Sequence, residues 1–502
     1  MATIRKQSLY SSIFIYLGFA IGAFNVLYLF PRFFTPEQFG LTRIIMDIAM
    51  IFSTVITAGI LPILYKFSPF YKSHLPKEKN DLTSIVIIYV TIAFAIFLIA
   101  LPYLKPFILR KFGKNSPLLL DYFHLVIPFT ISLSLFSVLE SLAWIIKKAV
   151  LSNFLRELIF RLITMVLILC WAWGLIRHYD IFISLYTNIF FISIFILIVV
   201  LFRSNQFKFQ FRISNLSRRL YPMMLKFGGA YFLSAIFNII ARTNDTLIIA
   251  SQSSGGLVDA AIFTIATYLI TIMDVPQRSL VGAAVPQIAE AWKDHDIKKL
   301  ERLYKKTALN LLIIGLAIMG LVLINIPILL TFLGPAYIGV PQLLLIIGLG
   351  KLIDLGTGLN SQILQLSKHW KIDLFTNMLF VVLSIILNYI LTKRYGIIGT
   401  AYGGLIAIIA FNLTRFIYIK KIYDLQPFTW SNLITIAVAT ILFISIGNIP
   451  IIGSFWTSAI IKSLFFISSF SLFIIKFNIS NDLTELFNLA LLKLRIRKKE
   501  GQ

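Results

Sequence analysis

Charged residues lie inside several long apolar segments of this 502-residue sequence, and they come in pairs of opposite sign. Arg242 and Asp245 are three residues apart, and Asp274 and Arg278 are four apart. Residues three or four apart share one face of an α-helix, so each pair can form an ion pair. Because a charge is costly in hydrocarbon, such residues indicate either a polar path through a membrane protein or ion pairs that hold helices.

Two further pairs have the same spacing: Arg43 with Asp47, and Lys351 with Asp354. The basic members of the four pairs are expected at different depths of the bilayer, and they form the candidate substrate-binding set of Arg43, Arg242, Lys351 and Arg278. Cations at several depths would suit an anionic group that crosses the membrane. The alternative stays open that each basic residue only pairs with its acidic neighbour and has a structural role.

The composition indicates a membrane protein, because 58% hydrophobic and 13% charged residues exceed what a soluble chain can bury. The net charge of +25 does not indicate nucleic acid, since Lys and Arg fall between apolar segments, where anionic lipid headgroups are the expected partner. The single cysteine, Cys170, lies in an apolar segment, and the five His lack metal-ligand spacing. We therefore predict no metal and no cofactor.

About fourteen segments are long enough, at 1.5 Å per residue, to cross roughly 30 Å of hydrocarbon as helices. They cover residues 8–30, 41–65, 82–104, 118–145, 150–175, 181–202, 223–250, 257–286, 308–332, 340–366, 372–392, 397–419, 432–449 and 455–475. Pro276 is expected to bend the eighth. The prediction is an all-α polytopic membrane protein without a separate soluble domain.

A weak internal repeat relates the first two spans, their turn and the basic segment after them to the seventh and eighth spans, at an offset of roughly 215 residues. The repeat predicts two pseudo-symmetric lobes of six helices, in residues 1–205 and 206–425. Residues 426–502 would add two helices and a basic amphipathic tail.

Basic residues also predict the orientation, because loops retained in the cytoplasm are enriched in Lys and Arg. Of the 46 Lys and Arg, about 29 fall on one side, about 8 on the other and about 9 within spans. Both termini should therefore be cytoplasmic, although residues 105–115 place four basic residues on the predicted outer side.

Two cytoplasmic segments are expected to form helices at the headgroups. In 293–307, Asp296 would cap a helix with Ile297, Leu300, Leu303 and Tyr304 on one face. In the tail, Asp482 and Glu485 have the spacing of a capping box, before an apolar stripe and a basic end.

Four blocks of sequence resemble the bacterial polysaccharide (O-antigen type) flippases of the multidrug, oligosaccharidyl-lipid and polysaccharide exporter superfamily. The first is LFPRFFTPEQFGL at 29–41, similar to the first outer turn of that family. The others are GGLVDAAIFTIATYLITIMDVPQRSLVGAAVPQIAEAW at 255–292, FLGPAYIGVPQLLLIIGLGKLID at 332–354 and LNYILTKRYGIIGTAYGGLIA at 387–407. Each block is short, but their order and spacing extend over nearly the whole chain.

The resemblance implies a transporter rather than an enzyme. It would move an undecaprenyl-pyrophosphate-linked oligosaccharide to the outer leaflet of the inner membrane, by alternating access of two lobes, for surface polysaccharide such as the O-antigen of lipopolysaccharide. Glycan polymerases or glycosyltransferases are the partners implied. A pyrophosphate needs cations in a wet cleft, which the basic set could supply.

Coupling to Na+ or H+ would need carboxylates or amides, and the candidates are Asp245, Asp373 and Asn377. Asp373 and Asn377 are four apart on the eleventh span, which is similar to the region where sodium binds in the lipid II flippase branch. Helix capping by Asp373 is the alternative interpretation.

Two other functions remain to be weighed. A cation-coupled multidrug exporter of the same superfamily should have a cavity dominated by acidic and aromatic residues, whereas basic residues prevail in these spans. A membrane glycosyltransferase or polymerase would normally carry a large outer loop, and the predicted outer loops are short.

Overall fold

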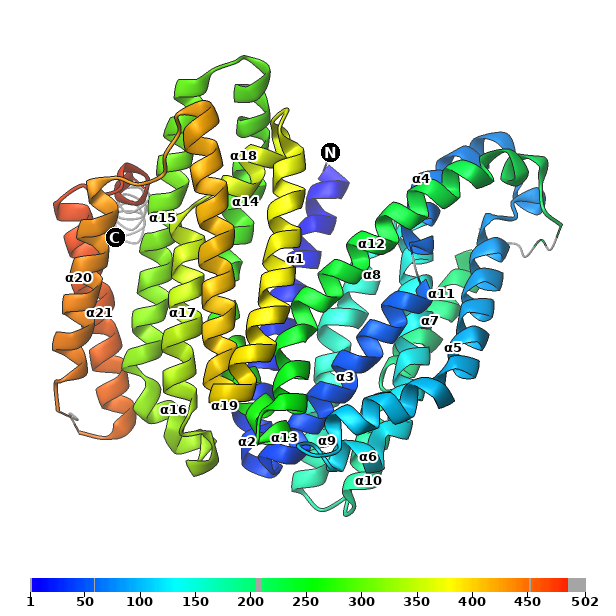
Figure 1. Cartoon of the computed structure of the whole chain (residues 1–502), viewed down its shortest axis with the longest axis horizontal. Helices are drawn as coiled ribbons and strands as arrows, with labels where there is room; N and C mark the ends of the chain where they lie inside the picture. The colour runs from blue at the N-terminus through cyan, green and yellow to red at the C-terminus, as the bar shows by residue number, and fades with distance from the viewer. Residues whose placement is uncertain (1, 58, 205–209, 211, 451–452, 486–502) are drawn as a thin grey trace, which may run out of the picture. The chain divides into compact units, whose positions relative to one another are not determined.

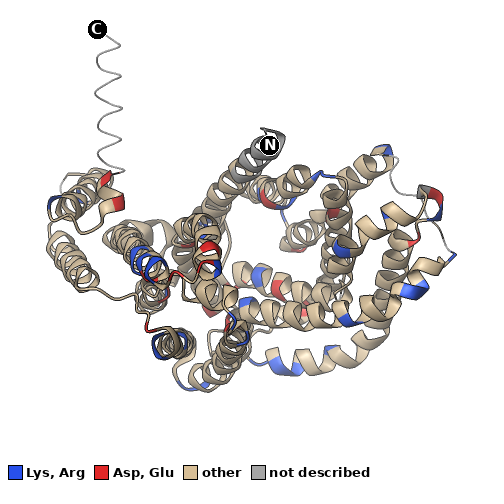
Figure 2. Cartoon of the chain, turned by 90° about the horizontal axis from the view of Figure 1, so that it is seen from above, with Lys and Arg blue, Asp and Glu red and all other residues tan. Residues whose placement is uncertain are grey.

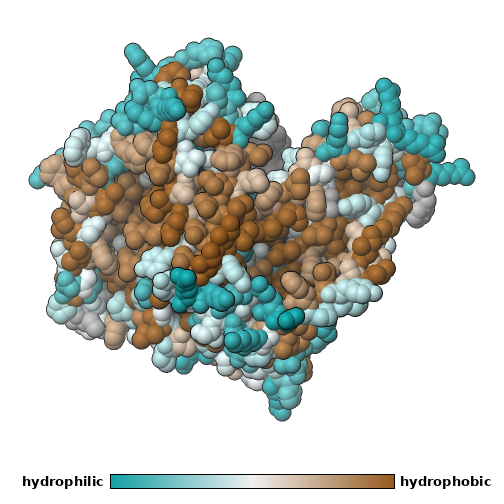
Figure 3. Space-filling view, in the orientation of Figure 1, coloured by the Kyte–Doolittle hydropathy of each residue, from teal (hydrophilic) through white to brown (hydrophobic). Residues whose placement is uncertain are grey.

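The computed structural model describes residues 2–57, 59–204, 210, 212–450 and 453–485, and all regular structure in them is helical. The chain forms two compact units, unit 1 at Met1–Thr264 and unit 2 at Ile265–Gln502. Figure 1 labels the helices of both. On the displayed face, apolar side chains cover the middle of each unit and hydrophilic ones gather toward the helix ends (Figure 3), as expected for helices that cross a bilayer.

The elements that begin in unit 1 are α1 (Ala2–Phe24), η1 (Asn25–Leu29), α2 (Phe30–Phe33), α3 (Pro36–Thr57), α4 (Ile60–His74), η2 (Lys77–Lys79), α5 (Leu82–Phe112), α6 (Leu118–Tyr122), η3 (Phe123–Leu125), α7 (Val126–Ile145), α8 (Ala149–Asn153), η4 (Phe154–Ile159), α9 (Phe160–Ala172), α10 (Tyr179–Asn188), α11 (Phe190–Ser204), α12 (Asn215–Gln252) and α13 (Gly256–Thr271). Of these, α3 packs against both α7 and α12 and forms much of the core.

The elements of unit 2 are α14 (Asp274–Lys293), α15 (Ile297–Ile324), α16 (Ile326–Leu333), η5 (Pro335–Tyr337), α17 (Val340–Gly356), α18 (Asn360–Leu366), α19 (Trp370–Tyr423), α20 (Trp430–Gly447) and α21 (Phe455–Lys476). Its central helix is α15, which packs against α14, α17, α20 and α21. This central position explains why α15 is mostly buried although its sequence is apolar enough to face lipid.

Eleven helices of the described residues are long and apolar enough to cross a membrane, and the pair α13 and α14 adds a twelfth. In α19, a non-helical backbone at Gly396 divides 54 residues into two helices. Residues 149–172 are also continuous helical backbone of mixed type, but Arg156, Glu157 and Arg161 make this segment more charged than the candidate spans. The described chain therefore contains eleven or twelve candidate spans, whereas about fourteen were predicted, and the division of α19 accounts for part of the difference.

The bend expected from Pro276 occurs a few residues earlier than the proline. α13 ends at Thr271, α14 begins at Asp274, and the two are bent by 42°. A proline ring clashes with the carbonyl four residues before it, here that of Ile272, so the helix breaks there. Pro276 itself lies in the first turn of α14, where a missing backbone N–H costs no hydrogen bond.

Gly40, near the start of α3, permits a close contact within unit 1. A Cβ atom there would lie 1.9 Å from the carbonyl oxygen of Leu257, at the start of α13. Real Cβ atoms do not approach that closely, so only glycine fits without moving α3 or α13. The PEQFG segment, which forms the start of α3, therefore has a packing reason for its glycine.

For both segments that were expected to form helices at the lipid headgroups, the structure differs from the prediction. Asp296 does cap a helix, since its side chain accepts from the Lys299 N–H at 2.8 Å, but this helix continues as the span α15. Leu300 and Tyr304 are fully buried in unit 2 rather than facing lipid headgroups. The reason is that α14 and α18 pack on α15 and its neighbours at this level.

In the tail, the predicted capping box at Asp482 and Glu485 is wrong. Ser480 precedes the helical residues and its hydroxyl accepts from the Leu483 N–H at 3.4 Å. Asp482 instead forms an ion pair with Lys306 at 2.5 Å, because α15 presents a lysine to it. The predicted apolar stripe and basic end from Leu486 onward lie outside the described residues.

Candidate functional site

Lys and Arg are spread along the helices of both units, as Figure 2 shows, and a subset lies in the spans. In unit 1, Nε of Arg43 is 3.0 Å from Oδ2 of Asp47, which confirms the predicted ion pair. Asp47 is fully buried and also accepts a hydrogen bond from Oγ1 of Thr246, on α12, at 2.6 Å. The Arg43 side chain is 30% exposed. Asp47 thus joins α3 to α12 and holds the Arg43 guanidinium at the surface of the unit.

Arg242 is exposed on α12, one helical turn before Thr246. Residues four apart share a helix face, so Arg242 lies on the face of α12 that meets α3 through Asp47. Asp245, a predicted coupling residue, is partly buried on the same helix. Arg43 and Arg242 therefore each lie one helical turn from the hydrogen bond that joins Asp47 to Thr246.

In unit 2, the ammonium of Lys351 is the centre of a polar cluster between α14 and α17. Its Nζ is 2.7 Å from Oδ1 of Asp274 and 3.3 Å from Oδ2 of Asp354. It also donates to Oε1 of Gln277 at 2.7 Å. The amide of Gln277 donates in turn to Oδ2 of Asp354 at 3.2 Å. The predicted pairing of Lys351 with Asp354 is confirmed, but it is only part of a four-residue cluster.

The expected pairing of Arg278 with Asp274 is not what the structure shows among its described residues, because Asp274 forms its ion pair with Lys351. Arg278 is exposed, one turn further along α14. The ammonium of Lys351, whose side chain is only 16% exposed, loses more hydration than an exposed guanidinium and gains more from the carboxylate. Arg278 is therefore left at the surface.

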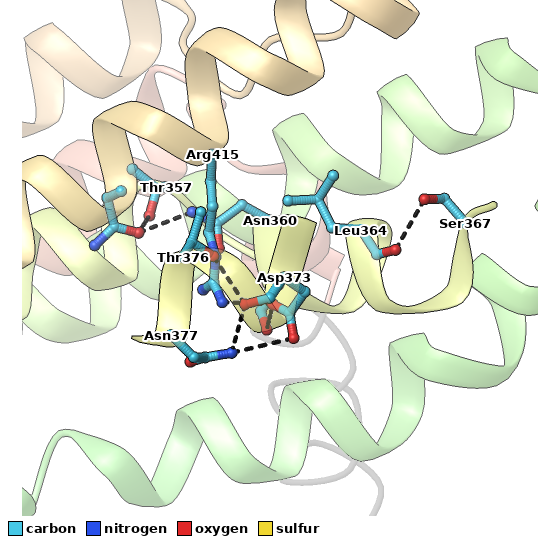
Figure 4. Close-up of polar contacts among 10 residues, drawn as sticks. Thr357, Asn360, Leu364, Ser367, Asp373, Thr376, Asn377 and Arg415 are labelled. Atoms are coloured by element: carbon cyan, nitrogen blue, oxygen red, sulfur yellow. Dashed lines mark hydrogen bonds and ion pairs between the residues drawn. The ribbon is translucent and has the colours of Figure 1, made fainter. Parts of the chain in front are cut away.

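Asp373 and Asn377, the other predicted coupling residues, belong to one hydrogen-bond network in unit 2 (Figure 4), in which Asp373 is buried and Asn377 is exposed. Asp373 forms an ion pair with Arg415 and accepts from Oγ of Ser361 at 2.7 Å. Nδ2 of Asn377 reaches the same carboxylate at 3.2 Å. Because Arg415 is only 2% exposed, its charge is fixed beside Asp373.

Arg415 is held by two further contacts. Its Nε donates to Oγ1 of Thr376 at 2.9 Å, and its guanidinium lies over the ring of Phe411 at 3.8 Å from the centroid. One turn of α19 earlier, Oδ1 of Asn412 accepts from Thr357 and Asn360 at 2.9 and 2.8 Å. These contacts tie α17, α18 and both halves of α19 together, so the network has a structural role.

Sequence reasoning missed Arg415, Gln277 and Thr246. Arg415 had a usable signal, since it is an arginine inside a predicted span with no acid within four residues, and such a residue needs a partner from another helix. Gln277 and Thr246 gave no such signal, because an uncharged polar residue in a span is common.

Within the part of the chain that the structure describes, no three or more His, Cys, Asp or Glu side chains are grouped so that they could hold a metal ion. The polar side chains described in the spans form ion pairs and hydrogen bonds instead, through charged groups, amides and hydroxyls. This chemistry binds and releases ions and phosphate groups by electrostatic contact and hydrogen bonds.

Solved membrane transporters share this fold. The lipid II flippase MurJ, in an inward closed conformation, is 17% identical, with a TM-score of 0.72 over 94% of this chain and 100% of its own. A multidrug resistance transporter of the MATE family, in the MOP superfamily, matches in its inward-facing conformation at 15% identity and a TM-score of 0.59, over 83% of this chain and 94% of its own. These matches confirm the predicted fold class, an all-helical multi-pass membrane protein.

The family model described as "Polysaccharide biosynthesis protein" matches residues 4–292, more than half of the chain. The chain therefore belongs to the polysaccharide biosynthesis protein family, as the resemblance indicated. It is a multi-pass membrane protein of polysaccharide biosynthesis, and its fold is the one seen in these solved membrane transporters. No curated protein matches it by sequence.

Proposed function

We propose that this protein is a flippase that moves an undecaprenyl-pyrophosphate-linked oligosaccharide across the bacterial inner membrane by alternating access of two lobes. The observation that carries the proposal is the exposure of Arg242 and Arg278 on membrane-spanning helices of a polysaccharide biosynthesis transporter. A guanidinium in such a position must meet water or an anion, since hydrocarbon does not solvate it. A pyrophosphate is the anion that a lipid-linked saccharide brings.

The four basic residues would then have two kinds of role. Arg242 and Arg278 are exposed and can meet a phosphate without first breaking a buried contact. Arg43 and Lys351 are already bound to carboxylates, so a phosphate must compete with Asp47 for one and with Asp274 and Asp354 for the other. We infer that Arg242 and Arg278 make the first contacts.

We further infer that both termini are cytoplasmic and that transport is coupled to Na+ or H+. Asp245 supports the coupling role, since it lies in a span directly before Thr246, whose hydroxyl bonds to Asp47. Asp373 and Asn377 support it less, because Arg415 already neutralises that carboxylate. The lobes at 1–205 and 206–425, and a glycan polymerase or glycosyltransferase as partner, remain part of the proposal.

The experiment is replacement of Arg242 or Arg278 by Ala in a cell that depends on this protein for a surface glycan. Loss of a charge-assisted contact of roughly 1.5–3 kcal/mol should lower the surface glycan about tenfold or more, while protein abundance stays normal. The matched control is Arg302→Ala, which removes an exposed arginine from the first two turns of α15.

If protein abundance falls together with the amount of surface glycan, the result supports the alternative that these arginines have a structural role. If either substitution leaves both the surface glycan and the efflux of a cationic drug unchanged, the multidrug exporter is favoured instead.

A further inference from the structure

A groove lined by apolar and aromatic side chains runs along α19, close to the break at Gly396 that divides this helix. Before the break its lining residues are Leu391 and Tyr395, and after the break they are Ile398, Tyr402 and Ile406. The groove has a volume of about 410 Å³, which is within the range of roughly 300–1,000 Å³ that binding pockets have. Tyr395, Tyr402 and Ile406 are exposed, so the groove opens at the surface of unit 2.

Two glycines hold the halves of α19 side by side near the break (Figure 1). A Cβ atom at Gly399 would lie 2.1 Å from the carbonyl oxygen of Leu391. A Cβ atom at Gly403 would lie 2.9 Å from the backbone nitrogen of Asn388. Small residues four apart commonly let membrane-spanning helices approach this closely. The backbone on both sides of the groove is therefore fixed before a ligand binds, which lowers the cost of binding.

The groove lies beside the face of α19 that packs inside unit 2. A Cβ atom at Gly350 on α17 would lie 3.4 Å from Ile408 and 3.5 Å from Leu405, so these two side chains face α17. Tyr402 and Ile406 are four residues apart and share a neighbouring face, where each residue is 45% exposed. On a helix that spans a membrane, an exposed face of this kind meets the acyl chains of the bilayer.

Two cations, Lys393 and Arg394, lie directly before Tyr395, at the end of the groove where the helix breaks. Both are exposed, and among the described residues neither takes part in an ion pair. The acidic residues nearest along the chain, Asp373 and Asp424, are each paired with another cation. Two adjacent cations beside an apolar groove match a molecule that has an anionic head and an apolar chain.

The length of the groove corresponds to one leaflet of a bilayer. From Ile398, beside the break, to Ile406 the helix rises roughly 12 Å, at 1.5 Å per residue. Half of the roughly 30 Å of hydrocarbon in a bilayer is about 15 Å. A chain that starts at the two cations and follows the groove past Ile406 therefore has the length of one phospholipid acyl chain, whose tip lies near the midplane of the bilayer.

We propose that the α19 groove binds one anionic phospholipid of the surrounding membrane, with its phosphate at Lys393 and Arg394 and one acyl chain along the groove. Tyr395 lies between these two parts of the lipid, at the level of the headgroups, where the amphipathic ring of tyrosine is commonly found. The site goes beyond the proposed function, because it needs a bilayer around the chain but no particular transported substrate. A bound lipid neutralises the two cations and covers the exposed apolar side chains.

The test is native mass spectrometry of the purified full chain, released from detergent micelles after addition of phosphatidylglycerol or of zwitterionic phosphatidylcholine. We expect one phosphatidylglycerol to stay bound, about tenfold more tightly than phosphatidylcholine or better, because two basic residues contact its phosphate. The double variant Lys393→Gln and Arg394→Gln should lose this preference. Ile406→Trp, which fills the groove, should weaken the binding of both lipids.

The matched control is Lys420→Gln with Lys421→Gln, which removes two adjacent exposed cations from the last turn of α19 and should keep the preference. If the double variant at the groove does not yield folded protein, Lys393→Gln alone should show a smaller loss of the same kind. A preference that survives removal of both cations, or equal retention of the two lipids by the unaltered protein, would overturn the site. Displacement of phosphatidylglycerol by an equal concentration of undecaprenyl phosphate would also overturn it, since the groove would then bind the polyprenyl lipid.

Discussion

Lys351 and Arg415 show two ways in which unit 2 carries a cation inside a membrane-spanning helix. Lys351 is partly exposed and shared between two carboxylates, whereas Arg415 is buried and, among the described carboxylates, forms its ion pair with Asp373. A buried ion pair contributes little net stability, but removing one partner leaves an uncompensated charge in a poorly hydrated place. The two cations should therefore respond differently to substitution.

Replacing Asp373 by Asn is predicted to destabilise the protein by about 3–5 kcal/mol, because the Arg415 guanidinium would remain buried without its carboxylate. Thermal unfolding of the purified protein in detergent measures the loss. The double variant Asp373→Asn with Arg415→Met should recover most of it, since no buried charge remains. An Asp373→Asn protein with unaltered stability and lost transport would instead support the predicted coupling role of Asp373.

The spacing of charged residues in the sequence predicted ion pairs within one helix better than ion pairs between two helices. Arg43 with Asp47 and Lys351 with Asp354 follow from helical spacing and are present. The contacts of Asp274 with Lys351 and of Asp373 with Arg415 join residues 77 and 42 positions apart. Nothing in local spacing selects such partners, because they depend on which helices become neighbours.

At the scale of elements, close helix contacts depend on glycines at particular points. Gly59 precedes α4 with a left-handed backbone, φ 73°, and a Cβ there would lie 2.1 Å from the carbonyl oxygen of Gly228 on α12. Any side chain at Gly59 would both strain the backbone and separate α4 from α12. The neighbouring Gly229 has open space instead, since no other element of the described chain comes within 4 Å of the position that a Cβ would take.

We predict that Gly59→Ala lowers stability by about 2 kcal/mol or more, from left-handed strain together with the displaced helix. Gly229→Ala is the matched control and should be neutral or stabilise by up to about 1 kcal/mol, through its helix propensity. Thermal unfolding of the two variants in detergent compares them. Equal effects of both substitutions would show that the contact of α4 with α12 is not tight.

Helix existence was predictable from the sequence, whereas helix ends and breaks were less so. Apolar segments of sufficient length marked the spans, and Pro276 marked the bend within a few residues. The start of α15 has the pattern of a separate surface helix, because Leu300 and Tyr304 lie on one face. That face is equally suited to packing on α14 and α18, and a single sequence does not reveal which surface will cover it.

At the scale of the whole molecule, the orientation in the membrane can be measured with cysteine labelling. The chain has one native cysteine, so Cys170→Ser gives a cysteine-free background. We predict that Lys114→Cys, on the predicted outer side, reacts with a membrane-impermeant maleimide in intact spheroplasts. His295→Cys, on the predicted cytoplasmic side, should react only after lysis. The reverse pattern would contradict the proposed orientation.

Class and family could be recognised from sequence because apolar length and a few turn motifs are local properties. The basic residues in the spans also suggested an anionic substrate, and the exposure of Arg242 and Arg278 is consistent with that role. Which carboxylates are permanently neutralised was not predictable, since Arg415 reaches Asp373 only in the folded chain.

The most direct test of the central claim is transport by the purified protein in liposomes. An undecaprenyl-pyrophosphate-linked oligosaccharide is placed in one leaflet, and its arrival in the other is read by lectin binding. We predict transfer by the unaltered protein and a large loss with the double variant Arg242→Ala and Arg278→Ala. Transfer that the double variant performs as fast as the unaltered protein would contradict a role for these cations in moving the phosphate-bearing lipid.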